Sequence, residues 1–404
     1  MTLVHRSRVV TFPFVAVTAV TLVFFTSIGI TLVTVPLFVE EELGAGEFGI
    51  GLTIASFAAA AIAARPLITR LGDRFGRRRL MMGGAVLAAA GSSVAGMAGT
   101  LPVLLVLRGI TGIGEAALFV GAITLIADLS PADRRAEGAS YFSIAVFGGL
   151  GVGPVLGEWV LADVHYERAF VTAGALALST AVLATLVPRS VDRVHDADDT
   201  STGSRRGILH PAAVGPGLVL ASIVAGFSTF TGFIPEHARA VGLSGAGGLF
   251  LVYSAVCLIG RVAGAKVPDR IGPGRAGSTA LVFVGASLLL LAAVPEPWAL
   301  WVAAAGFGVG MAFNYPSLMA IVVNRVDERE RVAALSSFTM FFELGSVVGG
   351  LALGGVGEAF GKRTGFAGGI VCCAIGLVVL WTKVVVPPQH VEMDIPQYPP
   401  LVCD

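Results

Sequence analysis

Long apolar stretches recur along the whole chain, and short polar stretches separate them. The segment from Phe48 to Ala64 contains no charged residue, and neither does the segment from Leu80 to Leu107. About 20 apolar residues in a helix cross a hydrocarbon core of about 30 Å. The pattern therefore predicts twelve membrane-spanning helices, at residues 11–36, 47–69, 79–98, 101–127, 137–161, 168–188, 211–235, 244–266, 275–294, 298–324, 332–357 and 365–386.

The chain is too poor in charge for a soluble protein. Of its 404 residues, 13% are charged and 55% hydrophobic, whereas soluble domains carry roughly 25% charged residues. Arg6 and Arg8 precede the first apolar stretch, as in a signal peptide, but signal peptides have an apolar core of only about 7–15 residues. We therefore expect a retained first helix and an all-α integral membrane protein within the lipid bilayer.

The basic residues are distributed asymmetrically. The net charge is zero, so bulk charge indicates no nucleic-acid partner. With the N-terminus in the cytoplasm, all but five of the 27 Lys and Arg residues fall on the cytoplasmic side. Such a bias sets the orientation of membrane proteins. We expect a multi-pass protein of the plasma membrane with both termini in the cytoplasm.

The chain matches itself at an offset of 196 residues, with four charged matches. We expect a six-helix bundle at 1–188, a cytoplasmic linker at 189–210, a second six-helix bundle at 211–386 and a cytoplasmic tail at 387–404. Each half has an even number of helices, so the repeats are parallel, and transporters place substrate sites between such halves. The charged matches are Arg65 with Arg261, Asp73 with Asp269, Arg74 with Arg270, and Arg135 with Arg331.

A cluster of charges, TRLGDRFGRRRL, connects the second and third predicted helices. Gly76 suits the tight turn, and arginines at this place orient the chain. Orientation does not account for Asp73, because acidic residues contribute little to it. A carboxylate at a helix end can pair with an arginine or with the positive N-terminus of another helix. Asp73 is therefore a candidate gating residue.

These residues resemble the major facilitator superfamily, and the resemblance covers essentially the whole chain. The family has two six-helix bundles that work by alternating access, and the resemblance implies that Asp73 latches the cytoplasmic gate. The further gating candidates are Arg74, Gly76, Arg77, Asp269 and Arg270. Helix 4 also resembles the family through Arg108, Gly112 and Gly114. The loop signature is kept at Asp73, Arg74, Gly76, Arg77 and Arg78, with Thr69 in place of its first glycine, and the second-half copy keeps Asp269, Arg270 and Gly272.

The fifth predicted helix contains GVGPVLGE, which is similar to a motif of antiporters that export drugs. Glu158 stands where that motif has its final glycine. Small residues allow helices to pack closely, and a proline bends a helix. We expect packing and bending together from Gly149, Gly153, Pro154 and Gly157.

Four charged residues stand out within the predicted helices, since a charge inside the membrane costs roughly 2.5–3.5 kcal/mol or more and usually faces a cavity or a partner. Arg108 and Glu115 are two helical turns apart, so both point the same way. A carboxyl group in such surroundings can load and release a proton, although Arg108 could instead form a purely structural pair. The candidate substrate and proton pathway is Arg108, Glu115, Glu158, Glu343 and Asn314.

The sequence indicates a secondary transporter and no enzyme. We find no metal-ligand spacing, no cofactor motif and no phosphate loop for ATP. We expect proton-coupled export of a small organic molecule by a monomer. The alternatives are proton-coupled uptake and, further away, a membrane enzyme or a sensor that no longer transports.

Overall fold

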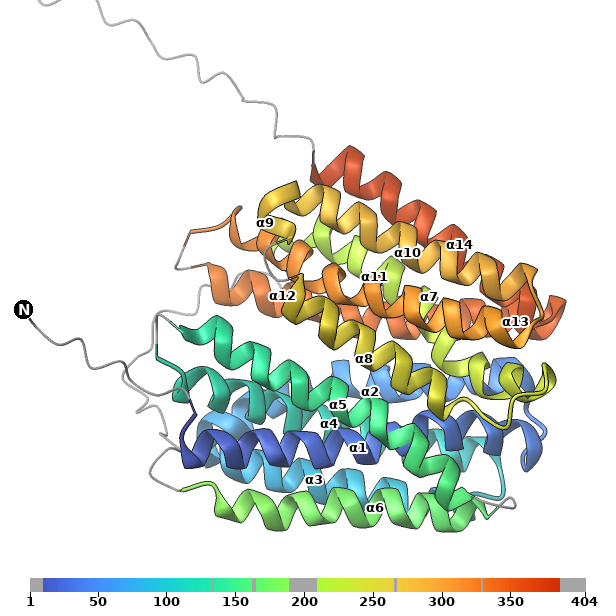
Figure 1. Ribbon diagram of the computed structural model, residues 1–404. Coiled ribbons are helices and arrows are strands. Elements are labelled where there is room, and N and C mark those ends of the chain that lie inside the picture. The colour runs from blue at the N-terminus through green and yellow to red at the C-terminus, as the bar shows by residue number, and fades with distance from the viewer. Residues whose placement is uncertain are drawn as a thin grey trace, which may run out of the picture.

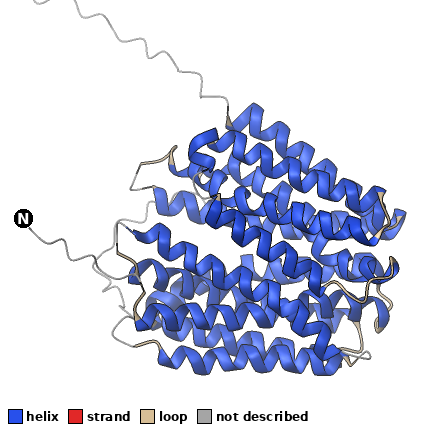
Figure 2. Ribbon diagram, in the orientation of Figure 1, coloured by secondary structure: helices blue, strands red, loops and turns tan. Residues whose placement is uncertain are grey.

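The computed structural model describes residues 10–131, 134–161, 165–188, 209–264, 267–327 and 330–385. All regular secondary structure within these ranges is helical (Figure 2). Eleven helical segments of the described chain are long and apolar enough to cross a membrane, and Gly247–Ala263 is a shorter apolar helix. The predicted all-α membrane fold is confirmed.

The first half of the chain forms the helices that we call the first bundle (Figure 1). Several of them extend beyond the predicted windows, because hydropathy marks only the part of a helix that suits hydrocarbon. The helices are α1 (Phe12–Glu41), α2 (Gly46–Phe75), α3 (Arg77–Ser93) with η1 (Ala95–Met97), α4 (Leu101–Leu129), α5 (Arg135–Leu161), and α6 (Tyr166–Leu183) with η3 (Ala184–Leu186).

The second half forms the second bundle. A stretch of π-helix interrupts its fifth spanning segment, which the sequence predicts as one regular helix over 332–357. The elements are α7 (Pro211–Ala240), α8 (Gly247–Ala263), α9 (Val267–Ile271), α10 (Pro273–Ala293), α11 (Pro297–Val323), α12 (Arg331–Val348), η5 (Gly349–Leu353), α13 (Gly354–Phe360), α14 (Lys362–Val379) and η6 (Leu380–Val384).

The two bundles repeat the same helix contacts. In the first bundle α1 packs on α5 and α6, α4 packs on α2 and α3, and α3 packs on α6. In the second bundle α7 packs on α12 and α14, α11 packs on α8 and α10, and α10 packs on α14. The bundles meet mainly where α5 contacts α8 and where α2 contacts α12, η5 and α13.

Glycines allow the closest of these contacts. A Cβ atom on Gly149 would lie 2.6 Å from the Thr26 nitrogen, and one on Gly157 would lie 3.1 Å from the Ile30 oxygen. These α5 glycines therefore pack against α1. Pro154 lies inside α5, which is continuous around it; bending during transport stays a prediction.

The two ends of the molecule need separate names. α1 and α7 begin, and α6 ends, at one end, on the left in Figure 1, which we call the linker end. The loops that join α1 to α2 and α7 to α8 lie at the opposite end, which we call the far end. The predicted tail and all of the predicted linker except Leu209 and His210 lie outside the described residues.

Candidate functional site

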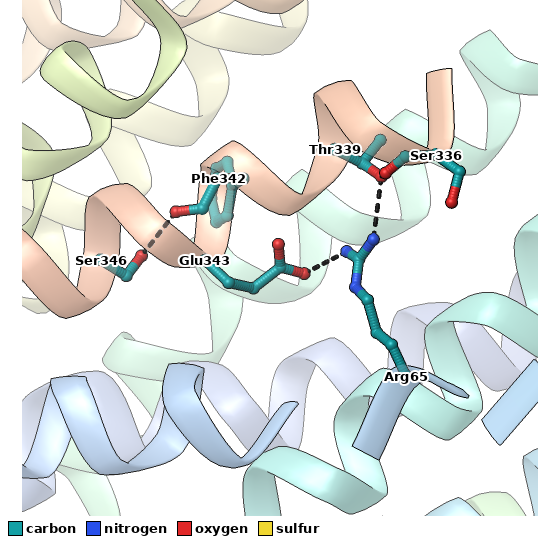
Figure 3. A network of polar contacts seen from close by, with 6 residues as sticks. All are labelled: Arg65, Ser336, Thr339, Phe342, Glu343 and Ser346. Carbon is teal, nitrogen blue, oxygen red and sulfur yellow. Dashed lines mark hydrogen bonds and ion pairs between the residues drawn. The ribbon is translucent and has the colours of Figure 1, made fainter. Parts of the chain in front are cut away.

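An ion pair connects the two bundles through Arg65 of α2 and Glu343 of α12 (Figure 3). The same guanidinium donates a hydrogen bond to the Thr339 hydroxyl at 3.0 Å. The two charged side chains are 22% and 20% exposed, so molecules of the size of water reach the pair. The second carboxylate oxygen of Glu343 is buried and has no partner among the described groups. The pair is therefore accessible but incompletely satisfied.

Glu115 of α4 adds a second carboxylate to this pair. It is partly buried, and it interacts electrostatically with both Glu343 and Arg65. Two acidic groups from different bundles thus share the field of one guanidinium. That Glu115 and Glu343 belong to one substrate and proton pathway stays a prediction.

Arg108 has a different partner from the one that the sequence suggests. Its guanidinium lies over the Phe57 ring of α2, 4.7 Å from the ring centre. Its Nε atom is buried without a hydrogen-bond partner in the described part of the chain. Arg65 rather than Arg108 is the arginine that interacts electrostatically with Glu115, and a common direction of Arg108 and Glu115 stays a prediction.

Arg261 of α8 makes the corresponding contacts on the other side of the interface. Its guanidinium donates a hydrogen bond to the Ser143 hydroxyl of α5 at 3.1 Å. It also lies over the Phe147 ring, 4.6 Å from the ring centre. Where Arg65 faces a carboxylate, Arg261 therefore faces an aromatic ring.

The interface consequently has two chemically different sides. α2, α4 and α12 provide Arg65, Arg108 and the two carboxylates, Glu115 and Glu343, whereas Arg261 is the charged group described for the other side. The opposite side is aromatic: the Phe147 ring centre lies 6.4 Å from that of Tyr253, which lies 5.5 Å from that of Phe227. Phe230 and Phe307 continue this cluster with ring centres 4.5 Å apart.

Asn314 belongs to α11 of the second bundle. It is buried, and its side-chain oxygen has no hydrogen-bond partner among the described groups. The Ser317 hydroxyl, three residues further on, is also buried and unpartnered there. A buried amide oxygen without a partner is costly, so Asn314 remains a candidate for binding a polar ligand or a water molecule.

At the far end the bundles are in backbone contact. A Cβ atom on Gly350 of η5 would lie 2.5 Å from the Gly51 oxygen of α2. The Phe48 nitrogen donates to the Glu358 carboxylate at 3.3 Å, and Arg239 of α7 pairs with Glu41 of α1 at 2.5 Å. No side chain larger than hydrogen fits between the two glycines, so the far end is closed.

Glu158 is part of this closed far end. Its carboxylate accepts a hydrogen bond from the Ala246 nitrogen, at the N-terminus of α8 in the second bundle. A carboxylate suits the positive end of a helix. Glu158 therefore lies apart from the cluster of Arg65, Glu115 and Glu343, and its departure from the antiporter motif has a structural reason.

At the linker end Asp73 is exposed and makes no ion pair within the described residues. Gly76 has φ of +86°, which explains the glycine at this turn. Arg77 pairs with Asp128 of α4, and the Arg74 guanidinium lies 5.2 Å from the Phe75 ring centre. Arg270 is exposed in α9, and the side chain of Asp269 lies outside the described part of the structure.

Two residues of the site were missed by the interpretation of the sequence. From the sequence, Arg65 and Arg261 are grouped with the basic residues that orient the chain in the membrane. The internal repeat contained the missing signal, since it matches Arg65 with Arg261 and also Thr339 with Ser143. Ser and Thr residues are common in helices, so these two hydroxyl groups could not be recognised as partners of the arginines from the sequence alone.

Known proteins resemble the chain over most of its length. The sequence profile of the Major Facilitator Superfamily matches residues 17–295 and 218–397. An uncharacterized MFS-type transporter of Burkholderia mallei (strain SAVP1) is 29% identical over 381 residues, 91% of each chain. Crystal structures of the nucleoside transporter NupG and of a POT family transporter in complex with 5-aminolevulinic acid have TM-scores of 0.70 and 0.76.

The nucleoside transporter is 15% identical in sequence, and the match covers 92% of the chain and 98% of that structure. The POT family transporter is 12% identical, and the match covers 91% of the chain and 94% of that structure. At such low identity these likenesses show the fold. Two repeated bundles of membrane-length helices define a multi-pass membrane protein. The profile match covers far more than half of the sequence, and the chain belongs to the Major Facilitator Superfamily.

Proposed function

We propose that the protein is a proton-coupled secondary transporter that exports a small organic solute by alternating access. The observation that carries this proposal is the cluster of Arg65, Glu115 and Glu343, in which one guanidinium is shared by two carboxylates from opposite bundles. Ionised groups at membrane depth are costly and mark ion or substrate pathways. Proton-coupled uptake by the same cluster is the second candidate.

The charge of the cluster supports proton coupling. One guanidinium balances one carboxylate, so a second carboxylate leaves an excess negative charge that a bound proton removes. With Glu115 protonated, Arg65 is free to hold Glu343 across the interface. When the bundles separate and Glu343 moves away, Arg65 becomes available to Glu115, which then releases its proton.

The two sides of the interface suit a solute with a polar end and an apolar body. Arg108 and Glu115 offer the polar end a cation and an anion, and Phe147, Phe227 and Tyr253 offer the body aromatic surface. Aromatic side chains give ligands a large contact area. In this arrangement the polar end of the solute lies at α2 and α4, and its apolar body lies on the side of α5 and α8.

We place the linker end in the cytoplasm of the cell, because most basic residues lie there. With the far end closed, the site has no access to the outside in this state, and the linker end opens further when the Arg65–Glu343 pair breaks. Asp73, exposed here, would engage the second bundle only when the linker end closes. A single chain contains both halves of the interface, which supports a monomer in the plasma membrane.

Proteoliposomes that contain the purified protein and an internal pH dye test the proposal. A panel of amphipathic solutes should include compounds that drive proton movement, and Glu115→Gln should abolish that movement. The matched control is Glu167→Gln, because Glu167 is exposed at the start of α6 and away from the cluster. Opposite directions of solute and proton support export, the same direction supports uptake, and solute flux that never moves protons contradicts both.

A further inference from the structure

A cavity of about 480 Å³ opens at the far end of the second bundle, away from the cluster of the proposed transport site. Val241, Pro295 and Phe360 give it an apolar wall, and Lys362 and Arg363 give it two cationic groups. Arg363 is exposed and makes no ion pair within the described residues. The cavity therefore contains one guanidinium group that makes no ion pair with a described residue.

His237 is a second and independent sign of a ligand. Its side chain is 6% exposed and lines the cavity, and its Nε2 atom has no hydrogen-bond partner among the described groups. The ring is held edge-on against Phe366, with ring centres 5.5 Å apart. Arg363 is close enough to His237 for the two to interact electrostatically. A fixed imidazole beside a free guanidinium provides donors for an anion.

Backbone donors point to the same place. α14 begins at Lys362, its first turn has no side-chain cap, and Gly361 lines the cavity. The N-terminus of a helix favours negative charge. Because Val241, Pro295 and Phe360 make part of the wall apolar, we propose that this cavity binds a small organic carboxylate, with the carboxylate group at Arg363 and the apolar body against Val241 and Phe360.

The first bundle takes part in this site through Glu47. Lys362 pairs with Glu236 of α7 and lies 3.8 Å from the Glu47 carboxylate of α2. A carboxylate ligand competes with Glu47 for Lys362 and is repelled by it. The ligand therefore binds more tightly when α2 leaves this position, and by linkage it favours an open far end.

The test uses calorimetric titration of the purified full-length protein with sodium benzoate, and with benzamide as its neutral analogue. We expect saturable benzoate binding, at least about tenfold weaker benzamide binding, and a loss of about tenfold in affinity in Arg363→Gln, equivalent to about 1.4 kcal/mol. His237→Phe keeps the ring contact and should also weaken binding. Glu47→Gln should strengthen it.

Two controls separate this site from the proposed transport site. Arg168→Gln removes an exposed arginine at the far end of the first bundle and should leave the affinity unchanged. Arg108→Gln reports whether benzoate binds at the proposed transport site instead. Unfolding temperatures show that each variant is folded. The proposal is overturned if benzoate does not bind, if Arg363→Gln binds like the original protein, or if only Arg108→Gln loses binding.

Discussion

Arg65 and Arg261 stand 196 residues apart and reach across the interface to hydroxyl groups that are also 196 residues apart. Arg65 donates to Thr339 at 3.0 Å, and Arg261 donates to Ser143 at 3.1 Å. The duplication has thus kept one contact geometry on both sides of the molecule. The second partner differs, since Arg65 meets Glu343 where Arg261 meets Phe147.

Beside these two arginines, only one side of the repeated frame has carboxylates. The position that matches Glu115 is Met311, and the position that matches Glu343 is Phe147. The arginine at the contact of α2 and α4 with α12 therefore has acidic neighbours, and Arg261 at the contact of α5 with α8 has none at the matching positions. We infer that the contact of α2 and α4 with α12 responds to protons, while the contact of α5 with α8 holds the bundles together in a manner that protons do not change.

The two arginine contacts should differ in strength. Double-mutant cycles that combine Arg65→Gln with Glu343→Gln should give a coupling free energy of about 1–3 kcal/mol, as expected for a charge pair in one network. The cycle of Arg261→Gln with Ser143→Ala should give a smaller coupling free energy, because it contains a hydrogen bond from a guanidinium to a neutral hydroxyl and no ion pair. Unfolding of the purified protein in detergent measures both. Equal coupling free energies in the two cycles would contradict a stabilising charge pair between Arg65 and Glu343.

Phe147→Glu would place a carboxylate at the position that matches Glu343. The new group lies beside Arg261, so we expect an added ion pair between α5 and α8 and a linker end that opens less readily. Transport should slow by about tenfold, equivalent to about 1.4 kcal/mol, while the unfolding temperature is kept or raised. Phe147→Gln is the control, and a similar slowing in that variant would show that loss of the ring, not the new charge, is responsible.

Gly350→Ala should prevent closure of the far end. An added Cβ atom would lie 2.5 Å from the Gly51 oxygen and 3.3 Å from the Ala55 nitrogen, and neither backbone group can move away cheaply. The fully buried Ile50, replaced by cysteine in a cysteine-free protein, should react faster with a membrane-impermeant maleimide. Gly83→Ala is the control because nothing lies within 4 Å of a Cβ atom there. Equal labelling rates in the two variants would contradict the closed far end.

Glu158→Ala should destabilise the closed far end by about 1 kcal/mol, the usual effect of removing a helix cap. Glu158→Gln should cost less, since an amide oxygen still accepts from the Ala246 nitrogen. The labelling assay at Ile50 measures the effect as faster reaction. If Glu158→Ala instead abolishes proton movement and leaves labelling unchanged, Glu158 belongs to the proton pathway.

Hydropathy predicts the fold because crossing a membrane imposes length and apolarity on each helix separately. It fails at η5, since the π-helical stretch from Gly349 to Leu353 depends on how η5 meets Gly51 of the other bundle. The same limit applies to the site. Glu115 and Glu343 stand out by their cost in an apolar helix, whereas Arg65 sits among other arginines, and only its position between the bundles distinguishes it.

The shift of Arg65 between Glu343 and Glu115 is tested most directly by the distance between α2 and α12 at the linker end. Spin labels at Thr69→Cys and Ala333→Cys, both exposed, report it in a cysteine-free protein. Raising the pH should shift the original protein toward longer distances, because ionised Glu115 repels Glu343 and competes for Arg65. Glu115→Gln should stay at the short distance at every pH. If the distance between the two labels in Glu115→Gln increases with pH as it does in the original protein, the account is contradicted.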